Sequence, residues 1–251
     1  MGKRFWDVVN DVIREADVIL EVMDSRFIEE TRNKEIEDKV RLRNKKLIYI
    51  LNKSDLINVP LEGIEHSLKN EDYVFVSSKD NLGTTILRSK IKAIKKRPLI
   101  VGVLGYPNTG KSSLINVLKQ KKSAKTASVA GFTKGLQKIK IEKDIYLLDT
   151  PGVIPYKERD EIKHAVINIM SPSKIKEPEY VAEDILKIAI EKNPKLVETL
   201  YKIKLKEDED LQELIERIAI NFKWLKKGGL PNIDLISRKI ITDWQRGKLV
   251  I

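Results

Sequence analysis

The sequence predicts an α/β domain with a mostly parallel sheet, followed by a small all-α domain. Short apolar runs alternate with amphipathic, helix-spaced segments through the first 150 residues, whereas after Pro155 only helical patterns remain. We therefore expect one domain over residues 1–155 and a helical domain over residues 156–251. A chain of 251 residues, of which 41% are hydrophobic and 34% charged, is long and apolar enough to bury both cores.

The elements of the first domain follow from periodicity, in chain order. Residues 5–16 place apolar side chains at helical spacing, and residues 18–23 form the nearly continuous apolar run of a strand covered on both faces. Because parallel strands end at the same edge of a sheet, ligands are expected at their carboxyl ends. The remaining expectations are a charged helix at 34–45, strands at 47–51, 73–76 and 99–104, a helix at 113–118, and a hairpin pairing 138–141 with 145–148.

The second domain should consist of helices punctuated by prolines. We expect them at 161–170, 179–191, 211–225 and 235–244, with Trp224, Leu225 and Trp244 in their shared core. Several basic side chains of this domain are candidates for contacts with RNA phosphates: Lys223, Lys226, Lys227, Arg238, Lys239, Arg246 and Lys248.

Composition excludes several classes of protein. The chain has no cysteine and two histidines, which excludes thiolate metal sites, cysteine nucleophiles and histidine-rich zinc sites. No apolar run approaches the roughly 18 residues of a membrane span, and Asp7 interrupts the N-terminus before any apolar stretch, unlike a signal peptide. We therefore expect a soluble, cytoplasmic protein with no membrane partner.

Positive charge is concentrated in one window of the chain. The net charge is +11, yet residues 88–140 contain fourteen lysines and arginines and no acid, leaving 34 basic and 37 acidic residues elsewhere. A general solubility bias would spread this charge along the chain. The window therefore predicts a polyanionic partner, either the phosphates of a nucleotide or a nucleic-acid backbone.

A complete phosphate-binding loop follows the strand at 99–104. Residues 105–112 read Gly-Tyr-Pro-Asn-Thr-Gly-Lys-Ser, which matches G-x-x-x-x-G-K-[ST]. Its glycines let backbone N–H groups converge on phosphates, and the following helix N-terminus adds partial positive charge. Lys111 should bridge the terminal phosphates, and Ser112 should ligate Mg²⁺. The residues expected to contact nucleotide here are Asn108, Thr109, Gly110, Lys111, Ser112 and Ser113.

Two further motifs complete the expected nucleotide site. Asp149-Thr150-Pro151-Gly152 follows the strand at 145–148 and indicates a sensor of Mg²⁺ and γ-phosphate, with Asp149 on the metal and the Gly152 N–H on the phosphate. Asn52-Lys53-Ser54-Asp55 follows the strand at 47–51. Asp55 would accept from guanine N1–H and N2–H₂, Asn52 would reach N7 or the phosphate loop, and the stem of Lys53 would cover the base. Adenine offers no such pair of donors, so this arrangement selects GTP over ATP.

Ser77-Ser78-Lys79 follows the strand at 73–76 and is similar to the loop that supports a guanine base from its other side. For this segment and for residues 52–55, the alternative is a solvated turn that caps a helix.

The motifs occur in an unusual order. A Ras-like chain begins with the phosphate loop, whereas here Asn52 precedes Gly105 by about fifty residues. Circular permutation explains this order, because termini lie at the surface and are often close together. The order and the motif residues strongly resemble the circularly permuted GTPases of the YlqF/RbgA and Nog2/nucleostemin group. The resemblance extends over nearly the whole chain, including residues 16–26, 228–232 and 243–248.

This resemblance implies a GTPase that binds GTP and GDP with Mg²⁺ and assists assembly of the large ribosomal subunit, with rRNA as a partner. Thr133 would be the second Mg²⁺ ligand, although Ala130 stands where the group usually has proline. Asn108 occupies the position where similar GTPases bind K⁺; the alternative is that it only braces the loop. Residues 119–135 should order around the γ-phosphate, or else remain a flexible basic loop.

The glutamine that usually orients the attacking water is missing, because its position is occupied by Val153. The expected catalytic contacts are therefore Lys111, Thr133, Gly152 and Asn108, with slow intrinsic hydrolysis that K⁺ and the ribosomal subunit stimulate. Because Gly152 leads directly into the second domain, GTP should also alter the affinity of that domain for RNA. The alternative is a nucleotide-gated RNA-binding module with negligible turnover.

Overall fold

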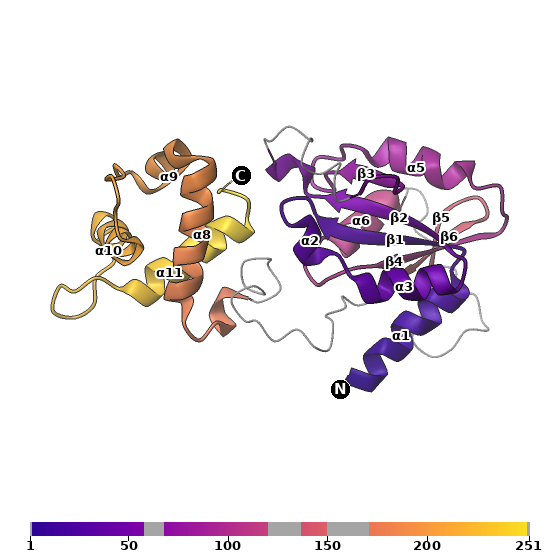
Figure 1. The fold of residues 1–251 in the computed structure, drawn as a ribbon, viewed down its shortest axis with the longest axis horizontal. Coiled ribbons are helices and arrows are strands. Elements are labelled where there is room, and N and C mark those ends of the chain that lie inside the picture. Colours follow the sequence, from indigo (N-terminus) through magenta and orange to yellow (C-terminus); the bar gives the residue numbers. More distant parts are fainter. Residues whose placement is uncertain (1, 58–67, 120–136, 150–170, 250–251) are drawn as a thin grey trace. The chain divides into compact units, whose positions relative to one another are not determined.

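The protein is described by a computed structural model covering residues 2–57, 68–119, 137–149 and 171–249. These residues form two compact units, one built around a β-sheet and the other from the helices that begin at Pro172 (Figure 1). The helix expected at 161–170 and the domain boundary expected after residue 155 lie outside the described residues, so the boundary stays a prediction.

A six-stranded, mostly parallel sheet organises the first unit, as predicted. Its order is β3-β2-β1-β4-β6-β5, and the first five strands in this order are parallel to one another, while β5 pairs antiparallel with β6. The antiparallel pair is the expected hairpin. The strands are β1 (Val18–Asp24), β2 (Lys46–Asn52), β3 (Tyr73–Val76), β4 (Leu99–Leu104), β5 (Gln137–Glu142) and β6 (Ile145–Asp149).

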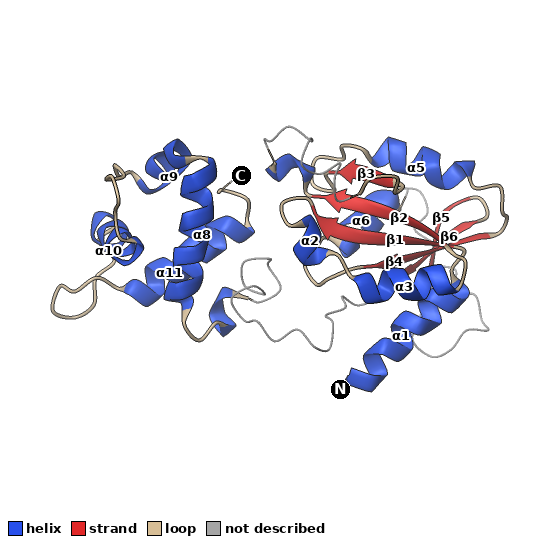
Figure 2. Ribbon diagram, in the orientation of Figure 1, coloured by secondary structure: helices blue, strands red, loops and turns tan. Residues whose placement is uncertain are grey.

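Helices cover both faces of this sheet (Figure 2). Side chains of β1 alternate between the two layers: Val18, Leu20 and Val22 pack with α5 and α6, while Ile19 packs with α1 and α3. This double burial is the reason that the strands read as continuous apolar runs. The helices of this unit are α1 (Gly2–Glu15), α2 (Ile28–Thr31), α3 (Lys34–Leu42), α5 (Thr84–Ala93) and α6 (Lys111–Leu118).

Polar groups are buried between β1, β2 and α3. Glu21 is fully buried in the centre of the sheet, where Oε1 accepts a 2.7 Å hydrogen bond from the Asn33 N–H. Burial raises the pKa of Glu21 to about 8. Nearby, Glu37 accepts from the Arg32 guanidinium at 2.6 Å and from the Tyr49 hydroxyl at 2.7 Å. Burial alone would raise the pKa of Glu37, but these donors outweigh it and lower that pKa.

The second unit is helical, as predicted. It contains α8 (Pro178–Lys192), α9 (Pro194–Tyr201), α10 (Leu211–Asn221) and α11 (Ile233–Gln245), preceded by a 3₁₀ turn at Pro172–Lys174. Trp244 is fully buried in its core. The sequence reading missed α9, although Pro194 stands at its first turn and the Asn193 side chain caps it by accepting from the Leu196 N–H.

Two expectations for this unit are wrong. The helix expected at 211–225 ends at Asn221, because Lys223 takes a left-handed conformation (φ 57°) and the Trp224 N–H bonds back to the Ala219 carbonyl at 2.9 Å. Leu225, expected in the core, lies beyond this stop and is 46% exposed.

Candidate nucleotide-binding site

The expected site residues follow strands that end at one edge of the sheet. β1, β2, β3, β4 and β6 run parallel, so their carboxyl ends lie together. The strands that follow β1 in the chain, β2 and β3, lie on one side of the β1–β4 pair. The strands that follow β4, β5 and β6, lie on the other side. The β1–β4 pair is therefore the topological switch point, where doubly wound sheets bind their ligands.

Two glycines shape the phosphate-binding loop between β4 and α6. Gly105 has φ 141°, and a Cβ there would lie 2.3 Å from the Val22 carbonyl oxygen. Gly110 has φ 96°, and a Cβ there would lie 2.1 Å from Nδ2 of Asn52. Only glycine combines these conformations with such close approaches. The loop is thus packed directly against the ends of β1 and β2.

The remaining loop residues divide into braces and exposed groups. Thr109 is buried and its hydroxyl donates to the Tyr106 carbonyl at 2.9 Å. Lys111 is also buried and its ammonium donates to that carbonyl, so it lies over the loop where phosphates would sit. Asn108, Ser112 and Ser113 are exposed, and Asn108 has a left-handed backbone (φ 58°). The two serines occupy the first turn of α6, where backbone N–H groups face outward.

Asn52 joins three segments of the site. Its side-chain N–H donates to the Thr109 carbonyl at 2.8 Å, and its Oδ1 accepts from the Ser78 backbone N–H and hydroxyl at 3.1 and 2.9 Å. The side chain therefore connects β2 with the phosphate loop and with the loop after β3. Of the two roles expected for Asn52, the structure contains the contact with the phosphate loop.

Asp55 and Lys79 face each other where these loops meet. Asp55 lies in a 3₁₀ turn (Ser54–Leu56) with its side chain 13% exposed, and one carboxylate oxygen is 4.0 Å from the Lys79 ammonium. Lys79 itself is well exposed. Ser77 is buried and accepts from the Asp80 N–H at 3.1 Å, which fixes the turn after β3. This ion pair thus joins the two segments that are expected to contact a base.

The sequence reading gave no role to the turn after β1. Asp24 is buried and binds Lys53 at 2.7 Å, and it also accepts two side-chain hydrogen bonds from Arg26 at 3.0 and 2.8 Å. Ser25 donates to the Asn52 carbonyl through its N–H at 2.8 Å and its hydroxyl at 2.7 Å. A detectable signal was present, because Asp24 ends an apolar strand in the same way that Asn52 does.

The other expected residues are only partly placed. The backbone of Asp149 ends β6, two strands from β1 and next to β4. Thr133 and Gly152 lie outside the described residues. In the basic window, acids from outside the window pair with Lys92 (Glu142, 2.8 Å) and Lys96 (Asp17, 2.5 Å). Part of the positive excess is therefore neutralised within the fold.

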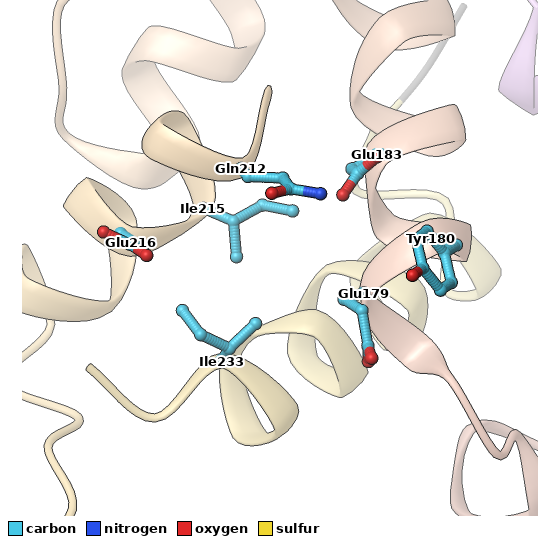
Figure 3. Close-up of a pocket in the computed structure, with 7 residues that line it drawn as sticks. All are labelled: Glu179, Tyr180, Glu183, Gln212, Ile215, Glu216 and Ile233. Atoms are coloured by element: carbon cyan, nitrogen blue, oxygen red, sulfur yellow. The ribbon is translucent and has the colours of Figure 1, made fainter. Parts of the chain in front are cut away.

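The helical unit contains a separate hollow of about 160 Å³ between α8, α10 and α11 (Figure 3). Ile215 and Ile233 form its apolar floor, and Glu183 extends toward Gln212 above them. Because Glu179, Glu183 and Glu216 line it, the hollow repels phosphates and does not fit a nucleotide.

Comparison with known proteins agrees with this geometry. A family model described as "50S ribosome-binding GTPase" matches residues 100–219. A GTP-binding protein of Methanocaldococcus jannaschii, MJ1464, is 39% identical over 246 residues, which are 96% of this chain and 65% of that protein. Nucleolar GTP-binding protein 2 of Saccharomyces cerevisiae is 32% identical over 260 residues, which are 99% of this chain and 52% of that protein.

The same fold occurs in a solved structure. GDP-bound YlqF of Thermotoga maritima superimposes with a TM-score of 0.72 at 23% identity, covering 97% of this chain and 96% of that one. The chain is thus homologous to two kinds of GTP-binding protein, MJ1464 and nucleolar GTP-binding protein 2, and it has the fold of YlqF.

Circular permutation accounts for the order of the strands in the sheet. If strands are numbered from β4, so that β1 becomes the fourth, the sheet reads 6-5-4-1-3-2 and the phosphate loop follows the first strand. The segments expected to read guanine then follow the fifth and sixth strands, which is the Ras-like order expected from the motifs. The chain covers about two thirds of the archaeal relative and about half of the yeast relative.

Proposed function

We propose that this chain binds GTP and GDP at the β1–β4 edge of the sheet and hydrolyses GTP slowly. The observation that supports this most directly is the position of Asn52, which connects the phosphate loop with both segments expected to read the base. Phosphate binding and guanine reading are thus coupled through a single amide. The Asp55 carboxylate favours guanine over adenine, because it can accept from the two donors that guanine presents and adenine lacks.

The donor set also fits Mg²⁺. Ser112 offers an exposed hydroxyl at the start of α6, and β6 ends with the carboxylate-bearing Asp149 on the strand beside β4. Hydroxyl and carboxylate oxygens are the hard ligands that Mg²⁺ prefers. We assign Ser112, Asp149 and Thr133 as its ligands. The ion would offset negative charge on the β- and γ-phosphates.

Lys111 and the Gly152 N–H then contact the transferred phosphoryl group. No glutamine follows Gly152, since Val153 stands there, so this chain supplies no side chain of that kind to orient water. A K⁺ ion beside the exposed Asn108 would provide positive charge where the transition state develops negative charge. Slow intrinsic turnover and stimulation by K⁺ follow from this arrangement.

We further propose that the partner is rRNA in the large ribosomal subunit. One loop of the helical unit is suited to it. The loop at 223–232 is ordered by hydrogen bonds from the Lys226 N–H to Leu230 at 2.7 Å and from the Asn232 N–H to Trp224 at 2.9 Å. It exposes Lys223, Lys226 and Lys227, which have no ion pair among the described residues.

Three of the other four basic candidates of this unit already pair with acids. Arg238 pairs with Asp234 at 2.8 Å, while Lys239 and Lys248 both bind the buried Asp243. Arg246 is exposed and has no ion pair among the described residues, so it remains a candidate. Phosphate contacts are therefore assigned to the 223–232 loop and to Arg246 rather than evenly to all seven residues.

The decisive experiment measures nucleotide binding, GTP hydrolysis and binding to ribosomal subunits on the same protein. Titration with fluorescent GDP and ADP should give far tighter binding of GDP. Phosphate release should rise when large subunits are added and not when small subunits are added. Co-sedimentation with large subunits should differ between GDP and a non-hydrolysable GTP analogue. Equal affinity for GDP and ADP would refute the nucleotide assignment.

The alternative, a nucleotide-gated RNA-binding module, predicts a different outcome of the same experiment. Subunit binding would still depend on the nucleotide, but phosphate release would stay at background with or without subunits.

A further inference from the structure

The turn after β1 contains a buried ionic cluster that the nucleotide contacts described above do not use. Asp24 is at its centre and is 1% exposed at its side chain. One carboxylate oxygen accepts from the Lys53 ammonium at 2.7 Å, and the Arg26 guanidinium binds both oxygens, at 3.0 and 2.8 Å. A buried carboxylate with two cationic partners is held in a single orientation.

This cluster acts on the segment that reads the base. Asp24 and Asn52 are register partners at the ends of neighbouring parallel strands. Ser25 fixes the Asn52 carbonyl with two hydrogen bonds, and Asp24 fixes the side chain of the next residue, Lys53. Lys53 also has a left-handed backbone (φ 62°), so its side chain leaves the strand in a direction that the strand itself does not impose.

The charges around Lys53 make Asp24 necessary for holding the Lys53 side chain in this direction. Burial and the neighbouring Arg26 charge both lower the pKa of Lys53, whereas Asp24 raises it. Without the carboxylate, two cations would face each other in a partly dry environment. The ammonium of Lys53 would then turn to solvent and take its aliphatic stem with it.

We propose that Asp24 is a positioning residue for guanine-nucleotide binding, which anchors the Lys53 ammonium so that the Lys53 stem lies against the base. This inference rests on the proposed function, since it needs a bound guanine. Asp24 acts on the nucleotide through Lys53 alone and leaves base choice to Asp55.

A double-mutant cycle tests this dependence. Lys53→Met removes the hydrogen bond and the ion pair between Asp24 and Lys53 and keeps an unbranched stem, whereas Asp24→Asn removes the ion pair. Each variant should raise the dissociation constant for GDP about tenfold, the cost of losing one partly buried charged hydrogen bond. In the Lys53→Met background, Asp24→Asn should change that constant less than about twofold, because the bond is already gone.

Two comparisons separate positioning from a general effect on folding. Asp72→Asn is the matched control, because Asp72 pairs with Lys46 at 3.2 Å and precedes β3 at the opposite, amino end of the strands. It should leave GDP affinity unchanged. The ratio of affinities for GDP and inosine diphosphate, which lacks the 2-amino group read by Asp55, should be the same in Asp24→Asn as in the wild type.

The outcomes are distinct. Failure of the wild-type chain to prefer GDP over ADP would overturn the proposed function, and this inference with it. If the wild type prefers GDP but Asp24→Asn weakens binding equally in both backgrounds, Asp24 does not act through Lys53 and the inference is wrong. Should Asp24→Asn fail to fold, Lys53→Met still decides, because it keeps the Asp24–Arg26 pair: unchanged GDP affinity in that variant refutes the inference.

Discussion

At the scale of single residues, the site depends on polar side chains whose partners are other parts of the protein. Asn52 and Asp24 each satisfy buried hydrogen-bonding groups on neighbouring segments. Asp55 is different, since its carboxylate has only the distant Lys79 ammonium at 4.0 Å as an ion-pair partner among the described residues. A carboxylate without a close ion-pair partner in the described part of the fold is available to bind a ligand.

Replacing Asp55 by asparagine should therefore change the base that is preferred. An amide presents a donor as well as an acceptor, and the 2-oxo group of xanthine accepts where guanine donates. We expect Asp55→Asn to weaken GDP binding by about 10²-fold or more, and to favour xanthosine diphosphate over GDP. Competitive titration of both diphosphates measures this. An unchanged preference for GDP would contradict the assignment of Asp55.

Glu21 provides a prediction about stability. Its folded-state pKa of about 8 exceeds the ordinary value of 4.5, so between these pH values the folded protein keeps a proton that the unfolded chain releases. Stability should fall as pH rises through this window, by up to about 1.4 kcal/mol per pH unit. Glu21→Gln keeps the acceptor for Asn33 and removes the titration, so its stability relative to wild type should grow from pH 5 to pH 8.

Urea denaturation at several pH values tests this prediction, with Glu37→Gln as the control. The pKa of Glu37 is lowered in the folded protein, so its contribution is lost only as pH falls below the ordinary range of a glutamate. Between pH 5 and pH 8 the free energy of unfolding of Glu37→Gln should change with pH in the same way as that of the wild type. If the free energy of unfolding of Glu21→Gln also followed that of the wild type across this pH range, Glu21 would be charged in the folded state.

At the scale of elements, the strands were predictable and the ends of helices less so. β3 and β4 begin and end where the apolar runs do, because both faces of the sheet are covered. The early end of α10 depends on Lys223 taking a left-handed conformation, a local choice that an amphipathic pattern does not reveal. The exposure of Leu225 follows from that end.

The candidate site shows the same division. The phosphate loop was predictable because its glycine spacing is visible in the sequence, and the base-reading role of Asp55 stays a prediction. The bonds from Asn52 to Thr109 and from Asp24 to Lys53 join residues 57 and 29 positions apart. Such contacts depend on the strand register, which the sequence pattern alone does not specify.

The phosphate loop provides a prediction about how K⁺ affects the rate of GTP hydrolysis. If Asn108 helps to hold K⁺, GTP hydrolysis should be roughly tenfold faster in K⁺ than in Na⁺ at matched ionic strength, a modest share of what electrostatic stabilisation contributes elsewhere. Asn108→Ala should abolish this difference and leave GDP affinity nearly intact. Asn116→Ala, which removes another exposed amide from α6, serves as control. Equal wild-type rates in the two salts would favour the bracing role of Asn108.

At the scale of the whole molecule, charge and chain order matter more than individual contacts. The basic window supplies more cations than a nucleotide needs, and within its described residues Lys90, Lys92 and Lys96 pair with acids. Lys119 follows the end of α6, whereas Lys121 and Lys122 lie outside the described residues. We expect this group to contact rRNA phosphates.

Reversing Lys119, Lys121 and Lys122 to glutamate should weaken binding to large subunits and reduce its dependence on salt, because fewer counterions are released. GTP affinity should be preserved. Reversal of Lys34, Arg43 and Lys45 changes the net charge equally outside the basic window and should have a smaller effect. Sedimentation at several salt concentrations measures both. Loss of GTP binding with unchanged subunit binding would contradict the prediction.

The permuted strand order also determines the sequence of events during synthesis. β1, β2 and β3 leave the ribosome before β4 and are adjacent in the finished sheet, so the half that carries the expected base-reading segments can assemble early. β4, which is followed by the phosphate loop, then pairs with β1, and β6 and β5 extend the sheet last. In a Ras-like order the phosphate loop would emerge first. In a nascent chain of this protein, the phosphate loop can therefore join the rest of the expected nucleotide site only after β4 has paired with β1, and nucleotide capture would report that the two halves of the sheet have met.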